Sequence, residues 1–520
     1  MEMMKKLITR NNILLIGILI IAATLRLYEI EGYMTFLGDE GRDAIVIYDI
    51  LHGNLTLLGP TASVGGFFMG PFYYYLVAPF FFLFGYSPVG AAVFVAVLSV
   101  ATVFLIWKIG KDFFGDFAGI IGALLYSISS LVITYSHSSW NPNVMPFFTI
   151  LTLYLVYKAV LKKNLWLFFI VGVLYGIDIQ LHYTELFIGL VIILYVIFTQ
   201  MEEYGKKYSS ISLAILRYGF TIFLGFLVGF SPFLAFEIRH GFPNIKSIFA
   251  FIFQSPNTGG DSHFLFTIQD VFFRLFGRLL FNFPTENYEK FYNPQILLTW
   301  YLLGNIIAIF CTLLLFYQLW KAFSKKTIQF YRYLLLIVWL GVGVLMFGFY
   351  KKQIYDYYFE FMFPLPFLII GNMLFFLWQK KAIQKVLTVI VITFSIISAY
   401  VTSPLHQQPN YQFNQAKEIA NAVLAQTNGK PFNFALITGG NSDHAFRYFF
   451  KLAKRDPVVI QNFDIDPKRT SVTDQLLIVC DTLPCSPLGH PLWEIAGFGR
   501  AEIVGHWRVI VIEIYKLTHL

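Results

Sequence analysis

Residues 89–107 read VGAAVFVAVLSVATVFLIW, an apolar run that contains no charged side chain. A helix rises about 1.5 Å per residue, so a run of this length crosses a hydrocarbon core of about 30 Å. Comparable runs recur from Ile13 to Val401. The pattern predicts a polytopic α-helical membrane protein with about eleven spans. We expect these spans at residues 13–29, 89–107, 117–134, 144–161, 165–181, 184–200, 213–236, 296–319, 331–349, 361–378 and 384–401.

The composition agrees with a chain that lies mostly in lipid. Hydrophobic residues make up 57% of the chain and charged residues only 13%, and the mean hydropathy is +0.64. Soluble domains carry about 25% charged residues, so the lipid bilayer is a predicted partner. In a soluble protein the net charge of +8 would suggest nucleic acid. Here the basic residues follow the membrane topology, and we expect no nucleic-acid partner.

Basic residues are divided unevenly between the two sets of connections. Eighteen Lys and Arg residues lie in the N-terminal tail and the even-to-odd connections, against eight in the much longer odd-to-even connections. Because basic loops stay in the cytoplasm, we expect a cytoplasmic N-terminus and an extracytoplasmic C-terminus in a plasma or inner membrane. The eighteen are Lys5, Lys6, Arg10, Lys108, Lys111, Lys158, Lys162, Lys163, Lys206, Lys207, Arg217, Lys321, Lys325, Lys326, Arg332, Lys380, Lys381 and Lys385. The eight are Arg42, Arg239, Lys246, Arg274, Arg278, Lys290, Lys351 and Lys352.

The chain divides by composition into a membrane domain, residues 1–401, and a polar tail, residues 402–520. Two long external loops interrupt the membrane domain, at 30–88 and 239–293. Within the second loop, residues 264–283 carry Asp270, Arg274 and Arg278 on one side, which favours an amphipathic helix at the membrane surface.

The tail has the pattern of a small α/β domain. A helix is predicted at 414–426, and short β-branched runs follow at 433–437, 475–479 and 509–514. Cys480 and Cys485 would face an oxidising space, where either a local disulfide or two free thiols would fit.

The first external loop carries the strongest chemical signal. Its sequence Gly38-Asp39-Glu40-Gly41-Arg42-Asp43 precedes a predicted helix at 42–51, and the aromatic segment GGFFMGPFYYY follows at 65–75. Helix capping explains one acid in such a position. It does not explain all of Asp39, Glu40 and Asp43 followed by an aromatic segment, and this loop is therefore the leading candidate for a functional site.

Other polar residues lie near the ends of predicted spans. Asp178, His182 and Glu185 would share one helical face if the helix continued through them, whereas a turn near His182 would break that face. Either substrate binding or simple contact with interfacial water would account for them. His137, in the short external connection between the third and fourth spans, is a further candidate for substrate binding.

In its order of motifs the chain resembles the GT-C glycosyltransferases, nearest to the protein O-mannosyltransferase and aminoarabinose-transferase group. The resemblance covers residues 10–400 approximately. It rests on the acidic pair after span one, the Gly/Pro-Tyr-Tyr segment before span two, and three further motifs. These are WNPN at 140–143, FLAFEIRHGFPN at 233–244, and Tyr357-Tyr358-Phe359 with Phe363-Pro364.

The resemblance implies an inverting transfer of one sugar from a polyprenyl-phosphate donor to an acceptor hydroxyl of a lipid, glycan or protein. It assigns the role of general base to Asp39, with Glu40 second. Further residues are candidates for binding the donor and its phosphate, namely Arg42, Tyr74, Asn141, Asn143, Arg239, His240, Lys351, Lys352 and Tyr358.

The resemblance also bears on metal binding. Members of this group often have an acid before span four, where this chain has Asn141 or Asn143. An amide is a poorer ligand than a carboxylate for a hard divalent cation, so we expect no tightly held catalytic metal.

Two other classes of protein remain as alternatives. A lipid or polysaccharide transporter should bury charges near the bilayer midplane, between broken helices. This chain places its charges mainly in loops and at the ends of spans. A polysaccharide ligase or a phosphoethanolamine-type transferase would need a different external loop or a reactive site in the tail, and the tail has no such motif.

Overall fold

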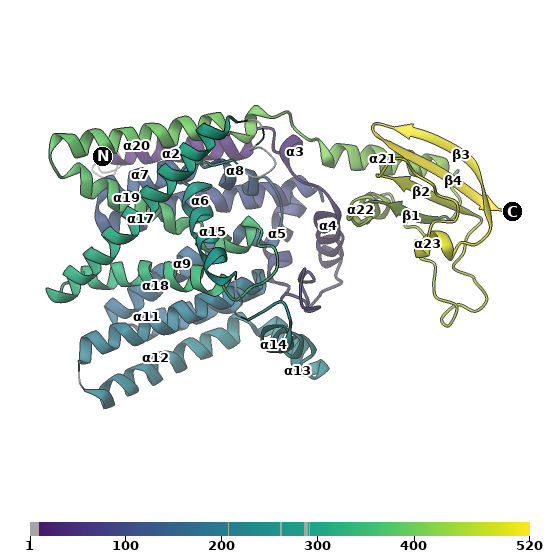
Figure 1. The fold of residues 1–520 in the computed structure, drawn as a ribbon. Coiled ribbons are helices and arrows are strands. Elements are labelled where there is room, and N and C mark those ends of the chain that lie inside the picture. Colours follow the sequence, from purple (N-terminus) through teal and green to yellow (C-terminus); the bar gives the residue numbers. More distant parts are fainter. Residues whose placement is uncertain (1–9, 206, 260–262, 285–289, 291) are drawn as a thin grey trace, which may run out of the picture.

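The computed structural model describes residues 10–205, 207–259, 263–284, 290 and 292–520. Lys5, Lys6 and Lys206 of the topology argument lie outside these residues. A bundle of roughly parallel helices forms most of the molecule, and a smaller domain with a sheet projects from one end (Figure 1). The beginning of helix α2 lies at the opposite end of the bundle from this domain.

Each predicted span contains an apolar helix. Among the described residues, seven helices are long and apolar enough to cross a membrane, or nine if two bent pairs each form one span. The two other predicted spans coincide with shorter apolar helices, so the count of eleven stays a prediction. The helices are α2 (Arg10–Leu27), α6 (Pro88–Phe114), α7 (Asp116–Ile128), α8 (Ser130–Ser136), α9 (Met145–Lys162), α10 (Leu165–Leu181), α11 (Leu186–Tyr204), α12 (Tyr208–Gly229), α17 (Pro294–Ser324), α18 (Gln329–Phe347), α19 (Pro364–Trp378) and α20 (Ala382–Val401).

Three predicted spans are not continuous helices. The third bends by 62° between α7 and α8, and the tenth bends by 56° between the 3₁₀ helix η3 (Asp356–Met362) and α19. At the first bend, the freed N–H of Ser130 donates to Asn282 Oδ1 at 2.8 Å. The seventh span, predicted to reach residue 236, ends at Gly229, because α13 (Ser231–His240) starts a new helix with Pro232 in its first turn.

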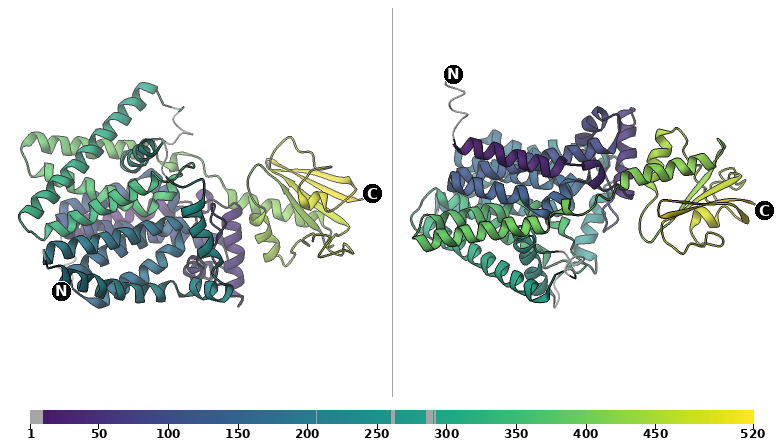
Figure 2. Two further views of the ribbon diagram at one scale, coloured as in Figure 1. Left: turned by 60° about the horizontal axis from the view of Figure 1, so that its bottom comes forward. Right: turned by 90° about the horizontal axis from the view of Figure 1, so that it is seen from above.

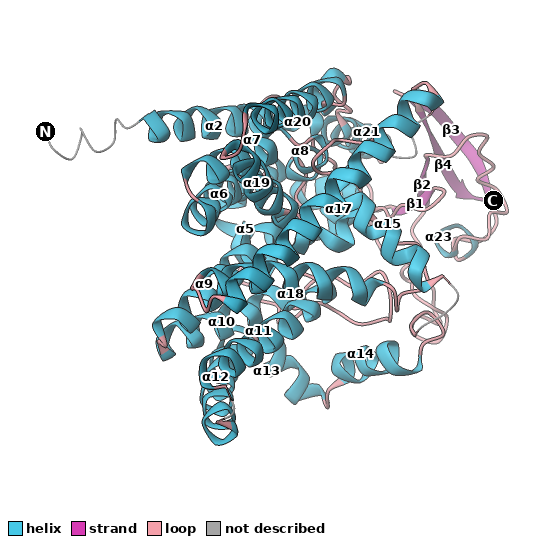
Figure 3. Ribbon diagram, turned by 60° about the vertical axis from the view of Figure 1, so that its left-hand side comes forward, coloured by secondary structure: helices cyan, strands magenta, loops and turns pink. Residues whose placement is uncertain are grey.

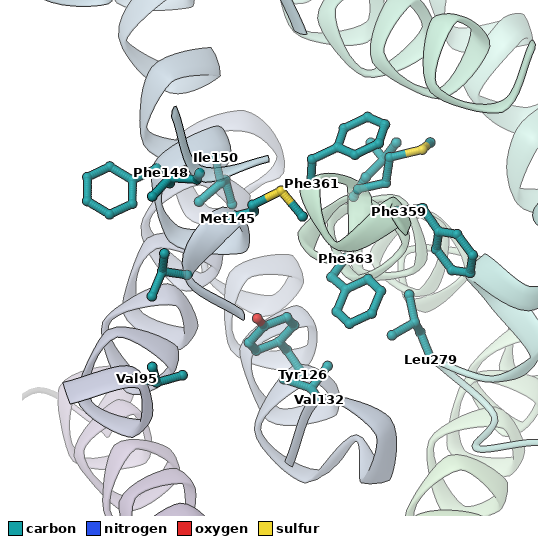
Figure 4. Close-up of a cluster of buried hydrophobic side chains, with 14 of the residues drawn as sticks. Val95, Tyr126, Val132, Met145, Phe148, Ile150, Leu279, Phe359, Phe361 and Phe363 are labelled. Carbon is teal, nitrogen blue, oxygen red and sulfur yellow. The ribbon is translucent and has the colours of Figure 1, made fainter. Parts of the chain in front are cut away.

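Short helices cover the end of the bundle that carries the small domain. They are α3 (Ile30–Tyr33), α4 (Gly38–Leu51), α5 (Phe72–Leu83), the 3₁₀ helices η1 (Asn141–Val144) and η2 (Tyr183–Glu185), α13, α14 (Pro243–Gln254) and α15 (Phe264–Gly277). Figure 3 shows α13 and α14 extending away from the main bundle, and both views of Figure 2 show the small domain projecting from one end. The bundle core lies between α6, α7, α9 and the η3–α19 segment, where Tyr126, Met145 and Phe361 are buried (Figure 4).

The segment 264–283 was predicted to form an amphipathic helix whose polar side faces water at the membrane surface. That orientation of the polar side was wrong. Arg274 of α15 is buried and donates from Nε to Asp356 Oδ1 at 2.7 Å. Arg278 donates to both oxygens of the same carboxylate, at 3.0 and 2.9 Å. The charged side therefore faces η3 within the protein, because Asp356 supplies a partner that the local sequence does not contain.

The tail forms the predicted α/β domain. Its four-stranded sheet has the order β1-β2-β4-β3, with β1 (Asn433–Ile437) parallel to β2 (Gln475–Cys480). β4 (Ile512–His519) is antiparallel to both β2 and β3 (Ala501–Val509). The remaining elements are the 3₁₀ helix η4 (Pro404–His406) and the helices α21 (Gln412–Gln426), α22 (His444–Leu452) and α23 (Trp493–Ala496).

The last predicted strand and the two cysteines of the tail can also be compared with the structure. The run predicted at 509–514 crosses the turn of the β3–β4 hairpin at Ile510 and Val511, so it is not one strand. Because the residues in and around this tight turn are apolar, the hydrophobic pattern does not reveal the turn. Of the two alternatives for the cysteines, the structure has the disulfide between Cys480 and Cys485.

The small domain packs directly on α4. Phe36, just before α4, lies against Phe413, Tyr448 and Phe449 with ring centroids 5.4–6.1 Å apart. A Cβ atom on Gly41 would lie 2.3 Å from the backbone nitrogen of Ala445 in α22, so only glycine allows the two backbones to come this close. The domain thus rests on the helix that carries the acidic motif.

Candidate active site

Helix α4 begins at Gly38, earlier than the predicted start at Arg42. The carboxylate of Glu40 accepts a hydrogen bond from the N–H of Leu37 at 3.0 Å, which satisfies one free donor at the start of the helix. Glu40 therefore caps the start of α4, and the side chain of Asp39 is available for other contacts. Burial, with the nearby charges of Asp39 and Asp43, raises the pKa of Glu40 to about 7, against the effect of its backbone hydrogen bonds.

Arg42 links two carboxylates at the head of α4. Its Nη1 donates to Asp39 Oδ1 at 2.8 Å, and its Nε and Nη2 donate to Asp43 Oδ1 at 3.0 and 2.8 Å. The hydroxyl of Tyr74 in α5 donates to the same oxygen of Asp43 at 3.0 Å. Asp43 is buried, and burial raises its pKa to about 6 although Arg42 and Tyr74 act in the opposite direction. The side chain of Asp39 is 54% exposed.

Asp39 and Arg42 open onto a cavity of about 270 Å³. Four distant segments contribute to its wall, and they bring Asn141 and His182 to the same space. The remaining lining residues are Pro60, Thr61, Ala62, Ser63, Met69, Trp140, Pro142, Tyr183 and Tyr357. The structure therefore assembles four of the predicted site residues, Asp39, Arg42, Asn141 and His182.

The cavity wall has an aromatic side that the sequence alone does not indicate. Trp140 and Tyr357 lie with ring centroids 4.4 Å apart, and His182 stacks on Tyr183 at 4.2 Å. Each ring belongs to a motif quoted for the resemblance or lies next to a predicted residue, but no local pattern pairs them. Aromatic walls with a few polar groups are typical of small-molecule sites.

His182 acts in this wall as a neutral group. It is 4% exposed, and burial lowers the pKa of its imidazole to about 3. Its Nδ1 lies 2.8 Å from the hydroxyl of Thr184. At neutral pH it can therefore exchange a hydrogen bond with a ligand but adds no positive charge.

The segment before α5 contributes Pro60, Thr61, Ala62, Ser63 and Met69 to the wall of the cavity. Gly59 and Met69 are joined by backbone hydrogen bonds, with Gly59 N–H donating to Met69 O at 2.8 Å and Met69 N–H to Pro60 O at 2.8 Å. A Cβ atom on Gly70 would lie 2.2 Å from the side chain of the buried Gln180. Glycine at position 70 is thus required for the close packing of this segment against α10.

The motif at 233–244 contacts the same segment. Glu237 in α13 is buried and accepts hydrogen bonds from the side chain of Asn244 at 2.7 Å and from the N–H of Ile245 at 3.0 Å. Asn244 in turn accepts from the N–H of Phe68 at 2.8 Å. The predicted phosphate-binding residues Arg239 and His240 are exposed at the end of α13 and do not line the cavity.

Other predicted residues do not line the cavity. Tyr74 contacts it through Asp43 and Arg42. Asn143 is held by donation to the carbonyls of Tyr135 and Ser138, at 2.7 and 2.8 Å. Three more predicted residues, Tyr358, Lys351 and Lys352, lie in the connection from α18 to η3 and in η3 itself.

Asp178 and Glu185 do not share a helical face with His182. α10 ends at Leu181, and His182 is extended with φ −159° and ψ 147°. Asp178 and Glu185 instead turn to α9, where they accept hydrogen bonds from Thr152 at 2.8 Å and Thr149 at 2.6 Å. The turn that the sequence left open is the one that occurs, and it separates the two buried acids from the cavity.

A further cavity of about 490 Å³ lies beside the first, toward the small domain. His137, Arg278 and Asp356 are on its wall, together with residues 402–408 approximately of the segment after α20. His137 is buried, its Nε2 lies 3.1 Å from the carbonyl of Leu25, and burial lowers its pKa to about 4. Sequence reasoning missed Asp356, an acid in the predicted connection between the ninth and tenth spans.

Within the described part of the chain, no three His, Cys, Asp or Glu side chains group as metal ligands would. The wall of the first cavity offers Asp39, already bonded to Arg42, and the neutral His182. Hard divalent cations prefer several oxygen ligands. This donor set does not fit a tightly held divalent ion.

Comparisons with known proteins agree with this architecture. A family model described as dolichyl-phosphate-mannose-protein mannosyltransferase matches residues 69–236, which is about a third of the chain. A search of curated protein sequences finds no match.

Solved structures match over nearly the whole length. ArnT from Cupriavidus metallidurans, determined bound to undecaprenyl phosphate, aligns with a TM-score of 0.60 at 11% identity, covering 96% of this chain and 97% of ArnT. The oligosaccharyltransferase AglB from Archaeoglobus fulgidus, in complex with an inhibitory peptide and a dolichol-phosphate, aligns with a TM-score of 0.53 at 13% identity. That alignment covers 90% of this chain and 69% of AglB. The chain therefore has the GT-C fold, the fold of the membrane glycosyltransferases ArnT and AglB.

Proposed function

We propose that the chain is an inverting glycosyltransferase that moves one sugar from a polyprenyl-phosphate carrier to an acceptor hydroxyl. The single observation that carries the proposal is the cavity that joins Asp39, Arg42, Asn141 and His182. The GT-C fold supports the reaction class, since ArnT and AglB were determined with undecaprenyl phosphate and dolichol-phosphate.

The chemistry requires one proton acceptor near the attacking oxygen. The acceptor oxygen forms a bond to the anomeric carbon while the bond from that carbon to the phosphate oxygen breaks. The hydroxyl proton moves to a carboxylate, and the polyprenyl phosphate leaves with the electron pair of the broken bond. A positioned general base contributes about 10²- to 10⁴-fold to such a rate. A single displacement from the opposite face inverts the anomeric centre.

Asp39 fits the role of base better than its two neighbours. Its side chain is 54% exposed and lines the cavity. Glu40 bonds its own helix start, and Asp43 is buried behind Arg42. Arg42 holds one oxygen of Asp39 at 2.8 Å, which orients the carboxylate and leaves its second oxygen for a proton.

Arg42 is the cation nearest to the proposed transfer. An Arg side chain has five N–H donors, so contacts with two carboxylates leave donors for a phosphate oxygen. Asn141 and the neutral His182 would hydrogen-bond sugar hydroxyls, and Trp140 with Tyr357 would pack against the apolar face of the ring. On the topology inferred from the basic residues, this site faces the extracytoplasmic side.

The decisive variant is Asp39→Asn. We expect release of polyprenyl phosphate from a donor in the presence of acceptor to fall by at least about 10²-fold, because an amide takes up no proton at neutral pH. The amide keeps the shape of the side chain and can still accept a hydrogen bond from Arg42, so the melting temperature should change little. A panel of synthetic polyprenyl-phosphate monosaccharides, assayed in detergent with membrane extract as the acceptor source, measures the rate.

Glu40→Gln is the matched control, since it removes the neighbouring charge without touching the cavity wall. It should retain most of the activity. If Asp39→Asn were active and Glu40→Gln inactive, the base would be Glu40. If no donor in the panel were consumed by the wild-type protein, or if both variants kept full activity, the proposed function would be wrong.

A further inference from the structure

A large cavity lies at the end of the bundle opposite the small domain. Its volume is about 590 Å³, and it lies between the last turns of α6, α17 and α19 and the first turn of α18. Five cationic side chains line its wall, namely Lys111, Lys321, Lys325, Arg332 and Lys380. We call it the basic cavity. The glycosyl-transfer site described above lies at the other end of the molecule and makes no use of it.

The positive charge of this wall is poorly compensated. Among the described residues on the wall, the one carboxylate is Asp112, and it is bonded to Lys108 at 2.9 Å and Lys158 at 3.0 Å. Lys111 pairs with Asp116 at 2.8 Å. Lys321, Lys325 and Lys380 form no ion pair with any carboxylate in the described part of the chain, and neither does Arg332. An anion in the cavity would therefore meet several cations without a competing partner.

Other groups of the wall are held in place rather than free to swing. Arg332 donates from Nη1 to the carbonyl of Phe113 at 2.7 Å and from Nε to the hydroxyl of Tyr157 at 3.1 Å. Asn372 is 3% exposed and donates to the side chain of Gln318 at 2.6 Å, which adds a polar amide pair to the wall. Polar groups at this depth of a membrane bundle are expensive, which favours a functional use.

The positive-inside rule explains a surplus of basic residues at this end, but it does not explain their convergence. Lys326, Lys381 and Lys385 belong to the same end and are as exposed as Lys321, Lys325 and Lys380, but they lie outside the wall. The cavity residues instead come from four helices and surround one space. Aromatic rings complete the wall, with the ammonium of Lys380 4.7 Å from the ring centre of Phe376.

We propose that the basic cavity binds the phosphate of an anionic phospholipid headgroup. Basic pockets between transmembrane helices bind such headgroups, each Lys or Arg near the surface adding to the attraction. The volume is within the range of about 300–1,000 Å³ that small-molecule sites occupy. Lys side chains would contact the phosphate, the Asn372–Gln318 pair would meet headgroup hydroxyls, and the aromatic rings would border the glycerol.

The test compares two triple variants with the same loss of charge. The first is Lys321→Gln, Lys325→Gln, Lys380→Gln, on the cavity wall. The second is Lys326→Gln, Lys381→Gln, Lys385→Gln, outside it. The full-length protein in neutral detergent is titrated with dioleoyl phosphatidylglycerol or dioleoyl phosphatidylcholine, and binding is measured by thermal shift and by retention of lipid in native mass spectrometry. All six lysines are exposed or line open space, so both variants should keep the lipid-free melting temperature.

We expect phosphatidylglycerol to bind the wild type and the second variant alike, and the first at least about 10-fold more weakly. Equal losses in both variants would mean attraction by surface charge alone and would overturn the proposal. So would equal binding of phosphatidylcholine. Saturable binding of inorganic phosphate to the wild type, lost in the first variant and unaccompanied by phosphatidylglycerol binding, would identify a soluble anion as the ligand and would overturn the lipid assignment.

Discussion

At the scale of single residues, the acidic motif separates into three acids with different surroundings. Asp39 lines the cavity, Glu40 bonds the start of its own helix, and Asp43 is buried between Arg42 and Tyr74. Neighbouring residues of a helix project their side chains in different directions, so the three acids meet different partners. Three carboxylates within five residues therefore face a cavity, a helix start and a buried arginine.

Arg26 shows the same effect of surroundings on a charged side chain. Its position near the end of α2 would allow it to extend toward water, but it is fully buried. Its guanidinium donates to Ser99 Oγ at 2.8 Å and to the carbonyl of Ser127 at 2.8 Å. The Ser127 carbonyl is free for this bond because α7 ends next to it, at Ile128.

The raised pKa of Glu40 predicts how stability depends on pH. Its pKa rises from 4.5 to about 7 on folding, so between these values the folded protein binds more protons than the unfolded chain. Stability contributed by this group is present at low pH and is lost as the pH rises toward 7. Glu40→Gln should therefore reduce the fall in melting temperature between pH 5 and pH 8, since the amide stays neutral and can still accept from Leu37. Melting curves of both proteins across this range measure the effect.

Glu502→Gln, on an exposed edge of β3, serves as the control and should leave the pH profile unchanged. A Glu40→Gln profile parallel to that of the wild type would mean that Glu40 keeps an ordinary pKa in the folded protein.

At the scale of elements, breaks between helices place the functional side chains. The end of α10 at Leu181 turns His182 into the cavity, and the start of η3 presents Tyr357 to Trp140. Each break leaves backbone groups that need partners, and side chains supply them, as Asn141 does by donating to the carbonyl of Leu181. A continuous helix at either place would remove one wall of the cavity.

The contact between α4 and α22 gives a prediction at this scale. Gly41→Ala would introduce a Cβ atom 2.3 Å from the backbone nitrogen of Ala445, which forces α22 away from α4. Overpacking of this kind costs about 1–3 kcal/mol. We expect a lower melting temperature and reduced transfer, because α4 carries Asp39 and Arg42.

Gly17→Ala in α2 is the matched control, because no atom lies within 4 Å of the added methyl group. It should have wild-type stability and activity. A Gly41→Ala protein that is equally unaffected would show that the small domain does not need its close contact with α4.

At the scale of the whole molecule, the bundle has two chemically different ends. One end carries the small domain, the 270 Å³ cavity and the acidic motif, and the other carries the basic cavity. The two ends differ in charge because the basic residues gather at the second. The arrangement would let the protein contact a lipid-linked donor at one membrane face and anionic headgroups at the other.

The orientation in the membrane is a prediction at this scale. Single cysteines at His240, exposed at the end of the bundle that carries the small domain, and at Lys381, exposed at the other end, distinguish the two faces. An impermeant maleimide applied to intact cells should label His240→Cys but not Lys381→Cys, and both after permeabilisation. Background labelling should be low, since Cys311 is buried and Cys480 is bonded to Cys485. Labelling of Lys381→Cys alone in intact cells would reverse the orientation.

The sequence by itself determined the membrane class, the positions of the apolar helices and the α/β character of the tail, and it directed attention to residues 38–43. These follow from local properties, because hydrophobic length and periodicity act within one segment. It also identified Asn141 and His182, each close to the end of a predicted span.

Only the tertiary structure decided which of these residues meet. Arg239 and His240 have the charge for a phosphate site but end up exposed, whereas Trp140 and Tyr357, far apart in the chain, form one wall. Asp356 became the partner of Arg274 and Arg278 in the same way. The physical reason is that helix bends and close backbone contacts, such as that of Gly41 with Ala445, depend on two segments at once. The sequence of one segment does not show which other segment will pack against it.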